Sequence, residues 1–137
     1  MSTKKIMGDM GEALAQKYLK RRFWRIVSTN YKAQGGEIDI IGYRFGVLVF
    51  FEVKTRSNQS YGTPASAVDN KKIKNIKTAG NSFLATYCSG NKLPKYRLNG
   101  EIKYKPIRKK RIDVIEIYAS ENNRINHIKD FNNGEEL

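Results

Sequence analysis

The chain contains a single cysteine, Cys88, among its 137 residues. One cysteine cannot form an internal disulfide and gives no zinc-ligand spacing, so neither a disulfide scaffold nor a zinc-stabilised module is expected. Long apolar runs are also lacking, and the longest, at residues 47–51, is far too short to cross a bilayer. The amino terminus has neither the sustained apolar stretch nor the small-residue cleavage site of a signal peptide. We therefore expect a cytoplasmic protein that does not enter a membrane.

Acidic residues are scarce relative to basic ones. The 26 Lys and Arg residues outnumber the 13 Asp and Glu residues, which gives a formal net charge of +13. Such a balance favours a polyanionic partner, and nucleic acid is the leading one because phosphate contacts dominate its affinity. The alternative is that the excess of lysine only aids solubility or reflects codon bias. Charge alone does not separate these two interpretations.

The length fits one domain over residues 1–137, with a core at about 8–131 and a polar tail at 132–137. Apolar spacing predicts helices over 8–22 and 65–87, and β-forming residues predict strands over 23–31, 37–43, 47–55, 111–119 and 124–131. A polar loop is expected at 57–64, whereas 96–107 fits either two short strands or a basic loop. This order predicts a single-domain α/β fold with one mixed sheet flanked by helices.

The strand predicted at 47–55 carries charged residues in an apolar setting. Its continuous apolar start indicates burial on both faces, and therefore a central place in the sheet. Glu52 and Lys54 share one face of this strand because side chains alternate along it. Asp39 lies between two isoleucines on the neighbouring predicted strand. Charged strand residues are usually solvated, but burying an acid costs several kcal/mol unless it is paired or bound to a metal.

Metal chemistry gives these residues a role. Mg²⁺ prefers oxygen ligands and keeps several waters, so Asp39 and Glu52 suffice as its protein ligands, and Mn²⁺ is the alternative ion. Lys54 is then expected beside the attacking water or the phosphate, where it can neutralise developing charge. Arg56, two residues further on the same face, can contact a phosphate through two hydrogen bonds. This set predicts a phosphodiester-cleaving site.

Three further groups of charged residues are weaker candidates. Glu12 either interacts with the dipole of the first helix or reaches the sheet as a third acid. Lys71 and Lys72 begin the basic half of the second predicted helix, and either contact nucleic acid or lie on a solvated face. Lys109 and Lys110 belong to a basic stretch at residues 95–111 that is either a phosphate-binding ribbon or a solvated hairpin.

These residues occur in a specific combination of motifs. They are Gly11-Glu12 with Ala15 and Tyr18-Leu19, Asn30-Tyr31, Gly36-Glu37-Ile38-Asp39-Ile40-Ile41, Val49-Phe50-Phe51-Glu52-Val53-Lys54-Thr55-Arg56, Lys71-Lys72, and Arg111-Ile112-Asp113-Val114-Ile115. Together they resemble the small bacterial YraN-type family over residues near 8–131. That family is similar in fold to archaeal Holliday-junction resolvases and to restriction endonucleases, the PD-(D/E)xK superfamily.

The resemblance implies a restriction-endonuclease-like α/β fold and a catalytic set of Glu12, Asp39, Glu52 and Lys54. It also implies that Lys71 can project a polar group to the site, and that the protein acts as a homodimer, as resolvases do. One departure is Ile38, which stands where the superfamily often has a proline. Another is the stretch at 95–111, which is longer than the usual connection.

Three functions remain open on the sequence, and the one with least support is a scaffold within a repair or recombination complex, to which only the acidic tail at 134–137 points. The first is a metal-dependent endonuclease that binds DNA, including structured or branched DNA. The second is a non-catalytic nucleic-acid-binding module with the same fold, in which the acids are structural or vestigial. A salt-dependent affinity for DNA is expected of both, so it does not distinguish them.

Overall fold

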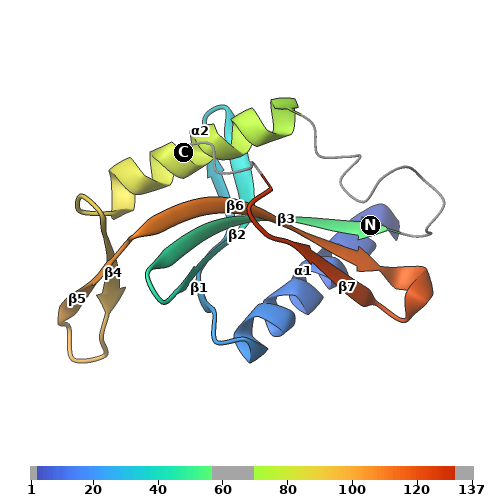
Figure 1. Ribbon diagram of the computed structural model, residues 1–137, viewed down its shortest axis with the longest axis horizontal. Coiled ribbons are helices and arrows are strands. Elements are labelled where there is room, and N and C mark those ends of the chain that lie inside the picture. Colours follow the sequence, from blue (N-terminus) through green and yellow to red (C-terminus); the bar gives the residue numbers. More distant parts are fainter. Residues whose placement is uncertain (1–2, 57–69, 132–137) are drawn as a thin grey trace.

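The computed structural model of the protein describes residues 3–56 and 70–131 (Figure 1). Its elements are, in chain order, α1 (Thr3–Arg21), β1 (Arg25–Ala33), β2 (Gly36–Arg44), β3 (Val47–Arg56), α2 (Asn70–Tyr87), β4 (Lys92–Tyr96), β5 (Ile102–Pro106), β6 (Lys109–Tyr118), a short 3₁₀ turn (Ala119–Glu121) and β7 (Arg124–Ile128). The loop predicted at 57–64, the first residues of the helix predicted at 65–87, and the predicted tail at 132–137 lie outside the described residues.

The main sheet has five strands in the order β1-β2-β3-β6-β7. Neighbours pair antiparallel except β3 and β6, which run parallel along their whole length, from Val47 opposite Lys109 to Arg56 opposite Tyr118. The connection from β3 to β6 therefore crosses over the sheet, and it contains α2 and the β4–β5 hairpin. The prediction of a mixed sheet with a central strand at 47–55 is confirmed.

The two helices cover opposite faces of this sheet (Figure 1). On one face Ile76, Ala79 and Phe83 of α2 pack with Leu48 and Phe50 of β3. On the other face, Ala15 and Leu19 of α1 pack with Val49 and Phe51 of the same strand. Alternation along a strand thus sends successive β3 side chains into two cores, which explains its unbroken apolar run. None of the described helices is long and apolar enough to cross a membrane.

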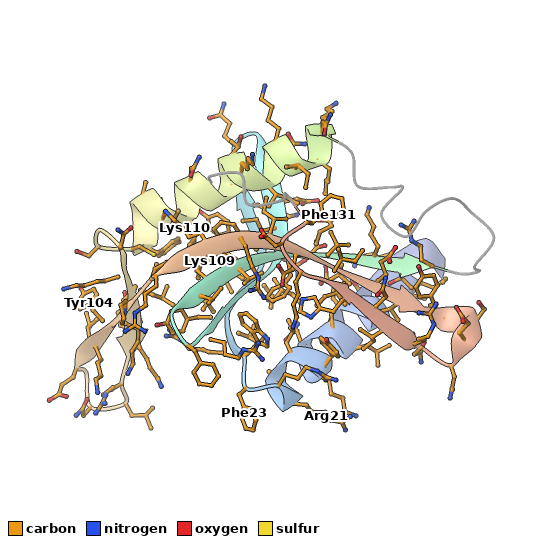
Figure 2. The ribbon with its side chains drawn as sticks, in the orientation of Figure 1. Arg21, Phe23, Tyr104, Lys109, Lys110 and Phe131 are labelled. Atoms are coloured by element: carbon orange, nitrogen blue, oxygen red, sulfur yellow. The ribbon has the colours of Figure 1, made fainter. Side chains whose placement is uncertain are left out.

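The end of α1 is fixed by backbone hydrogen bonds. The Trp24 N–H donates to the Leu19 carbonyl at 3.1 Å and the Phe23 N–H to the Lys20 carbonyl at 3.1 Å, with Phe23 at φ 67°. This is a Schellman-type end in which the left-handed position is taken by phenylalanine instead of the usual glycine. The arrangement buries Trp24 next to Leu19 in the α1 core, while Phe23 is exposed at the bottom of the molecule (Figure 2).

Several boundaries differ from the sequence prediction. The first helix begins at Thr3 instead of residue 8, and the last strand ends at Ile128 instead of residue 131. The first strand covers Arg25–Ala33, because the α1 end occupies residues 22–24. The ambiguous stretch at 96–107 contributes to a two-stranded sheet, β4–β5, so the strand alternative is correct. In Figure 1 this hairpin projects from one end of the molecule.

A substitution of Gly80 tests how tightly α2 packs on the sheet. A methyl group built at Gly80 lies 2.4 Å from Cε2 of the buried Phe50 ring, so Gly80→Ala forces the helix and sheet apart. We expect a loss of about 1–3 kcal/mol in the free energy of unfolding, measured by urea denaturation. The matched control is Gly8→Ala in α1, where nothing lies within 4 Å of the added methyl and stability should rise by about 0.5–1 kcal/mol. Equal effects at both glycines would contradict this packing.

Candidate metal centre and active site

The candidate site lies where the central sheet divides. Pairing between β2 and β3 stops at Ile40 opposite Phe51, although β2 begins at Gly36 and β3 continues to Arg56. Beyond that point β2 stays paired with β1, and β3 stays paired with β6. In Figure 1 the cyan turn between β1 and β2 rises toward α2, whereas the green end of β3 runs to the right, away from that turn. Just beyond the last pair, Asp39 precedes Ile40 on β2 and Glu52 follows Phe51 on β3.

Asp39 bridges the start of this division. The Val53 N–H donates to Asp39 Oδ2 at 2.8 Å, in the place of a ladder hydrogen bond to the backbone of β2. Burial raises the pKa of the Asp39 carboxyl above its ordinary value, while the hydrogen bond from Val53 and the charge of Lys72 act in the opposite direction. The carboxylate therefore fixes the spacing of the two strands where their backbones no longer pair.

Glu52 is the more buried of the two acids, with 3% of its surface exposed. The Lys54 Nζ lies 3.5 Å from Glu52 Oε1, and the Lys72 Nζ lies 3.6 Å from the same oxygen. The other oxygen, Oε2, is buried and has no hydrogen-bond partner among the described residues. Burial and the charge of Asp39 raise the pKa of Glu52 to about 7, although the two lysines oppose the shift. A cation bound at Oε2 would stabilise the ionised form of Glu52 and lower its pKa.

Glu12 reaches the site from α1. The preceding residue is Gly11, where an added methyl group would collide with the Thr55 hydroxyl, so glycine lets the helix touch the end of β3. Burial raises the pKa of Glu12, a hydrogen bond with Asn30 opposes the shift, and the charge of Asp39 adds to it. The third predicted acid therefore lines the same cavity as Asp39 and Glu52.

These side chains line one open cavity of about 460 Å³. Its walls come from α1, β2, β3 and α2, and comprise Met7, Gly8, Glu12, Glu37, Asp39, Glu52, Val53, Lys54, Thr55 and Lys72. All of the predicted catalytic residues, Glu12, Asp39, Glu52 and Lys54, are therefore brought together. Glu37 stands at the rim, with Lys72 Nζ 4.0 Å from its Oε1.

The donor set of the cavity fits one hard divalent cation. Within residues 3–56 and 70–131 no three His, Cys, Asp or Glu side chains gather closely enough to hold a metal between them. Mg²⁺ does not need such a group, because two carboxylates with several retained waters satisfy it. The unpartnered Oε2 of Glu52 beside Asp39 is the observation that supports this fit. Asp39 and Glu52 would then be the two protein ligands of the ion, and Glu12, on the cavity wall, would not contact it directly.

The structure separates the residues predicted to bind nucleic acid. Lys72 lines the cavity, whereas the neighbouring Lys71 is exposed on α2 outside it. Arg56 is held by Glu116 of β6, whose Oε2 lies 3.2 Å from Nη2. Lys109 and Lys110 lie at the start of β6 (Figure 2), about 17 and 13 Å from the level of Glu52 at 3.3 Å per residue. The sequence pattern predicted that Lys72 contacts nucleic acid, and it did not predict the ion pair of Lys72 with Glu52.

β6 carries polar networks that the sequence pattern did not predict. Asp113 is fully buried, accepts two hydrogen bonds from Arg111 at 2.9 and 3.2 Å, and lies 2.7 Å from His127 Nε2. Tyr18 of α1 continues the chain, with its hydroxyl 3.0 Å from His127 Nδ1. These contacts join α1, β6 and β7 on the face away from α2. The signal in the sequence was a pair of charges two residues apart at the start of a strongly apolar strand.

The fold and the site define a class of small α/β protein in which a dividing sheet carries an acid- and lysine-lined cavity. The chain belongs to the family described as "Uncharacterised protein family UPF0102", which matches residues 11–117. Its sequence thereby confirms the YraN-type resemblance.

Several relatives that carry the name UPF0102 protein match about nine tenths of the chain. The protein of Alkaliphilus oremlandii is 38% identical over 126 residues, which cover 91% of this chain and 96% of the relative. That of Clostridium beijerinckii is 38% identical over 129 residues, 92% of each chain. That of Dictyoglomus thermophilum is 35% identical over 125 residues, 91% of this chain and 92% of the relative.

Stability should depend on pH through Glu52. Its folded-state pKa of about 7 exceeds the ordinary value of 4.5, so between these values the folded state binds more protons than the unfolded state. The stability contributed by protonated Glu52 is therefore present below pH 4.5 and lost as the pH rises through 7. Glu52→Gln, which stays neutral, should match the wild type at low pH and exceed it by on the order of 2 kcal/mol at about pH 8.

Urea unfolding at both pH values measures this difference, and Glu101→Gln on the exposed β4–β5 turn is the control. The assignment is wrong if Glu52→Gln shifts the midpoint equally at both pH values, or if it destabilises the protein above pH 7.

Proposed function

We propose that this protein is a metal-dependent endonuclease of the restriction-endonuclease-like class, the PD-(D/E)xK superfamily, and that its substrate is DNA, including branched DNA. The observation that carries the proposal is the half-buried Asp39 beside the buried Glu52, which has one oxygen without a hydrogen-bond partner among the described residues and stands next to Lys54 on the wall of an open cavity. A chain with a net charge of +13 that keeps acids on the wall of an open cavity matches a polyanionic substrate and a cation between the two.

Asp39 and Glu52 are the residues that would hold Mg²⁺ or Mn²⁺. Bound there, the ion would polarise a phosphoryl oxygen and lower the pKa of a water molecule. Burial and the repulsion from Asp39 raise the pKa of Glu52, and a bound cation would offset both, so the ionised pair would be more stable with a cation than without one.

The remaining groups of the cavity serve the reaction of water with the phosphodiester. One oxygen–phosphorus bond forms, one ester bond breaks, and a proton passes from the water to the departing oxygen. Lys54, part-exposed beside Glu52, can donate to a phosphate oxygen as negative charge develops. Glu12 has a raised pKa and lies on the cavity wall, which suits it to accept the proton of the water.

The basic residues outside the cavity supply affinity for the DNA backbone. Lys71 is exposed beside the cavity on α2, and Arg56 continues the same face of β3 beyond Lys54. Lys109 and Lys110 lie at the other end of the sheet, where they can contact only a substrate that extends well beyond the cavity. A junction presents two strands to be cut, so a two-fold homodimer is the expected acting form.

One observation favours the alternative of a non-catalytic nucleic-acid-binding module. Lys54 and Lys72 both lie within 4 Å of Glu52 Oε1, at 3.5 and 3.6 Å, so the charge of this acid is balanced in part without a metal. In a binding module these contacts would be structural ion pairs of the dividing sheet. Cleavage assays separate the two functions.

Purified protein should cut flapped or four-way-junction DNA in the presence of Mg²⁺ or Mn²⁺. Asp39→Asn and Glu52→Gln keep the shape of each side chain but remove its charge, so each should lower the cleavage rate by at least about 100-fold. Lys54→Met should lower it without removing metal binding. Glu101→Gln, on the exposed β4–β5 turn, should leave the rate unchanged, while the loss of cleavage in the Asp39 and Glu52 variants excludes a contaminating nuclease.

Equal cleavage by wild type and Asp39→Asn would sink the proposal. Tight, salt-dependent DNA binding with no cleavage by the wild type in either metal would favour the binding module instead.

A further inference from the structure

A second cavity lies at the other end of α2. It has a volume of about 290 Å³, and its lining is Arg25, Val27, Ser28, Tyr31, Phe83, Tyr87, Leu93, Pro94 and Tyr96. These residues come from β1, from the last turns of α2 and from β4. In Figure 1 this yellow end of α2 lies beside the β4–β5 hairpin, whereas the green start of α2 lies toward the end of β3.

The aromatic walls of this cavity are preformed. The Tyr31 ring meets the Phe83 ring edge-on with centroids 5.5 Å apart, and it meets the Tyr87 ring at 6.1 Å. The Tyr31 hydroxyl is also 3.2 Å from the Ser82 hydroxyl, which fixes the ring. Tyr87 and Tyr96 keep 53% and 71% of their surface exposed although they line a cavity. Exposed rings on two different elements that border one cavity are suited to stack on a flat ligand.

Arg25 adds a polar group to these walls. Its Nη2 donates to the Pro94 carbonyl at 2.9 Å and thereby ties β1 to the hairpin. Its Nη1 is buried and has no hydrogen-bond partner within the described part of the chain. A buried donor without a partner is uncommon, and because Nη1 is closed to solvent, a ligand acceptor reaches it only when the guanidinium shifts toward the cavity.

We propose that this cavity binds an unstacked nucleobase of a single-stranded segment of nucleic acid. A nucleobase has a flat face for the tyrosines and acceptor atoms along its edges for Arg25. The cavity has the volume of the smallest ligand sites, about 300 Å³, which suits one base and not a folded partner. The net charge of +13 favours a phosphate-linked ligand over a neutral aromatic molecule.

The position of the cavity agrees with such a ligand. The stretch of α2 from Lys72 at the candidate active site to Phe83 and Tyr87 at this cavity spans about 16–22 Å, at 1.5 Å per residue. Lys71 and Lys74 are exposed on the first half of this helix. A strand whose backbone follows the helix would therefore present one base to the aromatic cavity while another part lies at the carboxylates. The inference rests on the proposed function to the extent that both require nucleic acid.

The test measures binding apart from cleavage, in Asp39→Asn protein. Tyr87→Ala and Tyr96→Ala should each weaken binding of a labelled single strand about 12 nucleotides long by about tenfold, because one stacked base is lost. Binding of the matching duplex, whose bases are not available, should stay unchanged. Tyr87→Phe should keep the single-strand affinity, since stacking needs the ring and not the hydroxyl.

The matched control is Phe23→Ala, which removes an exposed aromatic ring from the end of α1, outside this cavity (Figure 2). A strand that carries 2-aminopurine should also change its fluorescence on binding to protein with an intact cavity, and not on binding to Tyr87→Ala.

Unchanged affinity in both tyrosine variants would overturn the inference and leave the proposed cleavage intact. Equal losses in Phe23→Ala, or a change in self-association by sedimentation in place of a change in strand affinity, would also overturn it. If no strand or duplex binds at all, the proposed function fails together with the inference.

Discussion

The hydrogen bond from the Val53 N–H to the Asp39 carboxylate, at 2.8 Å, is the contact on which the candidate site depends. It stands where β2 and β3 lose their ladder, and it holds the two strands at the distance that opens the cavity. Without it a part-buried N–H of the central strand would lose its acceptor, which is costly in itself. The same carboxylate raises the pKa of Glu52, so one residue serves both the architecture and the electrostatics.

The elements around this division each contribute one group. Gly11 lets α1 approach Thr55 and so places Glu12 on the cavity wall, while α2 brings Lys72 to Glu52. The far side of the sheet is fixed independently by the buried network of Asp113, Arg111 and His127. Because these other contacts stabilise the fold, the Asp39–Glu52 pair can keep an oxygen without a hydrogen-bond partner and a raised pKa, as is expected of a functional site.

The sequence predicted what depends on local pattern. The apolar run of β3 correctly predicted that this strand is central in the sheet, and the alternation of side chains correctly predicted that Glu52 and Lys54 lie on one face of it. It did not predict that α1 starts at Thr3, because the first turns carry few apolar residues, or that residues 22–24 form a helix end with phenylalanine in a left-handed position. The contacts of Lys72 with Glu52 and of Arg56 with Glu116 join residues far apart in the chain. Such contacts depend on how helices and strands pack, which spacing does not encode.

Diffraction from crystals soaked in Mn²⁺, with anomalous scattering recorded at the manganese edge, would show whether Asp39 and Glu52 bind one metal ion. We expect one strong peak within about 2 Å of oxygens of both Asp39 and Glu52, and its loss in Asp39→Asn crystals. A wild-type crystal with no peak between these carboxylates, or with a peak that persists unchanged in Asp39→Asn, would contradict the account.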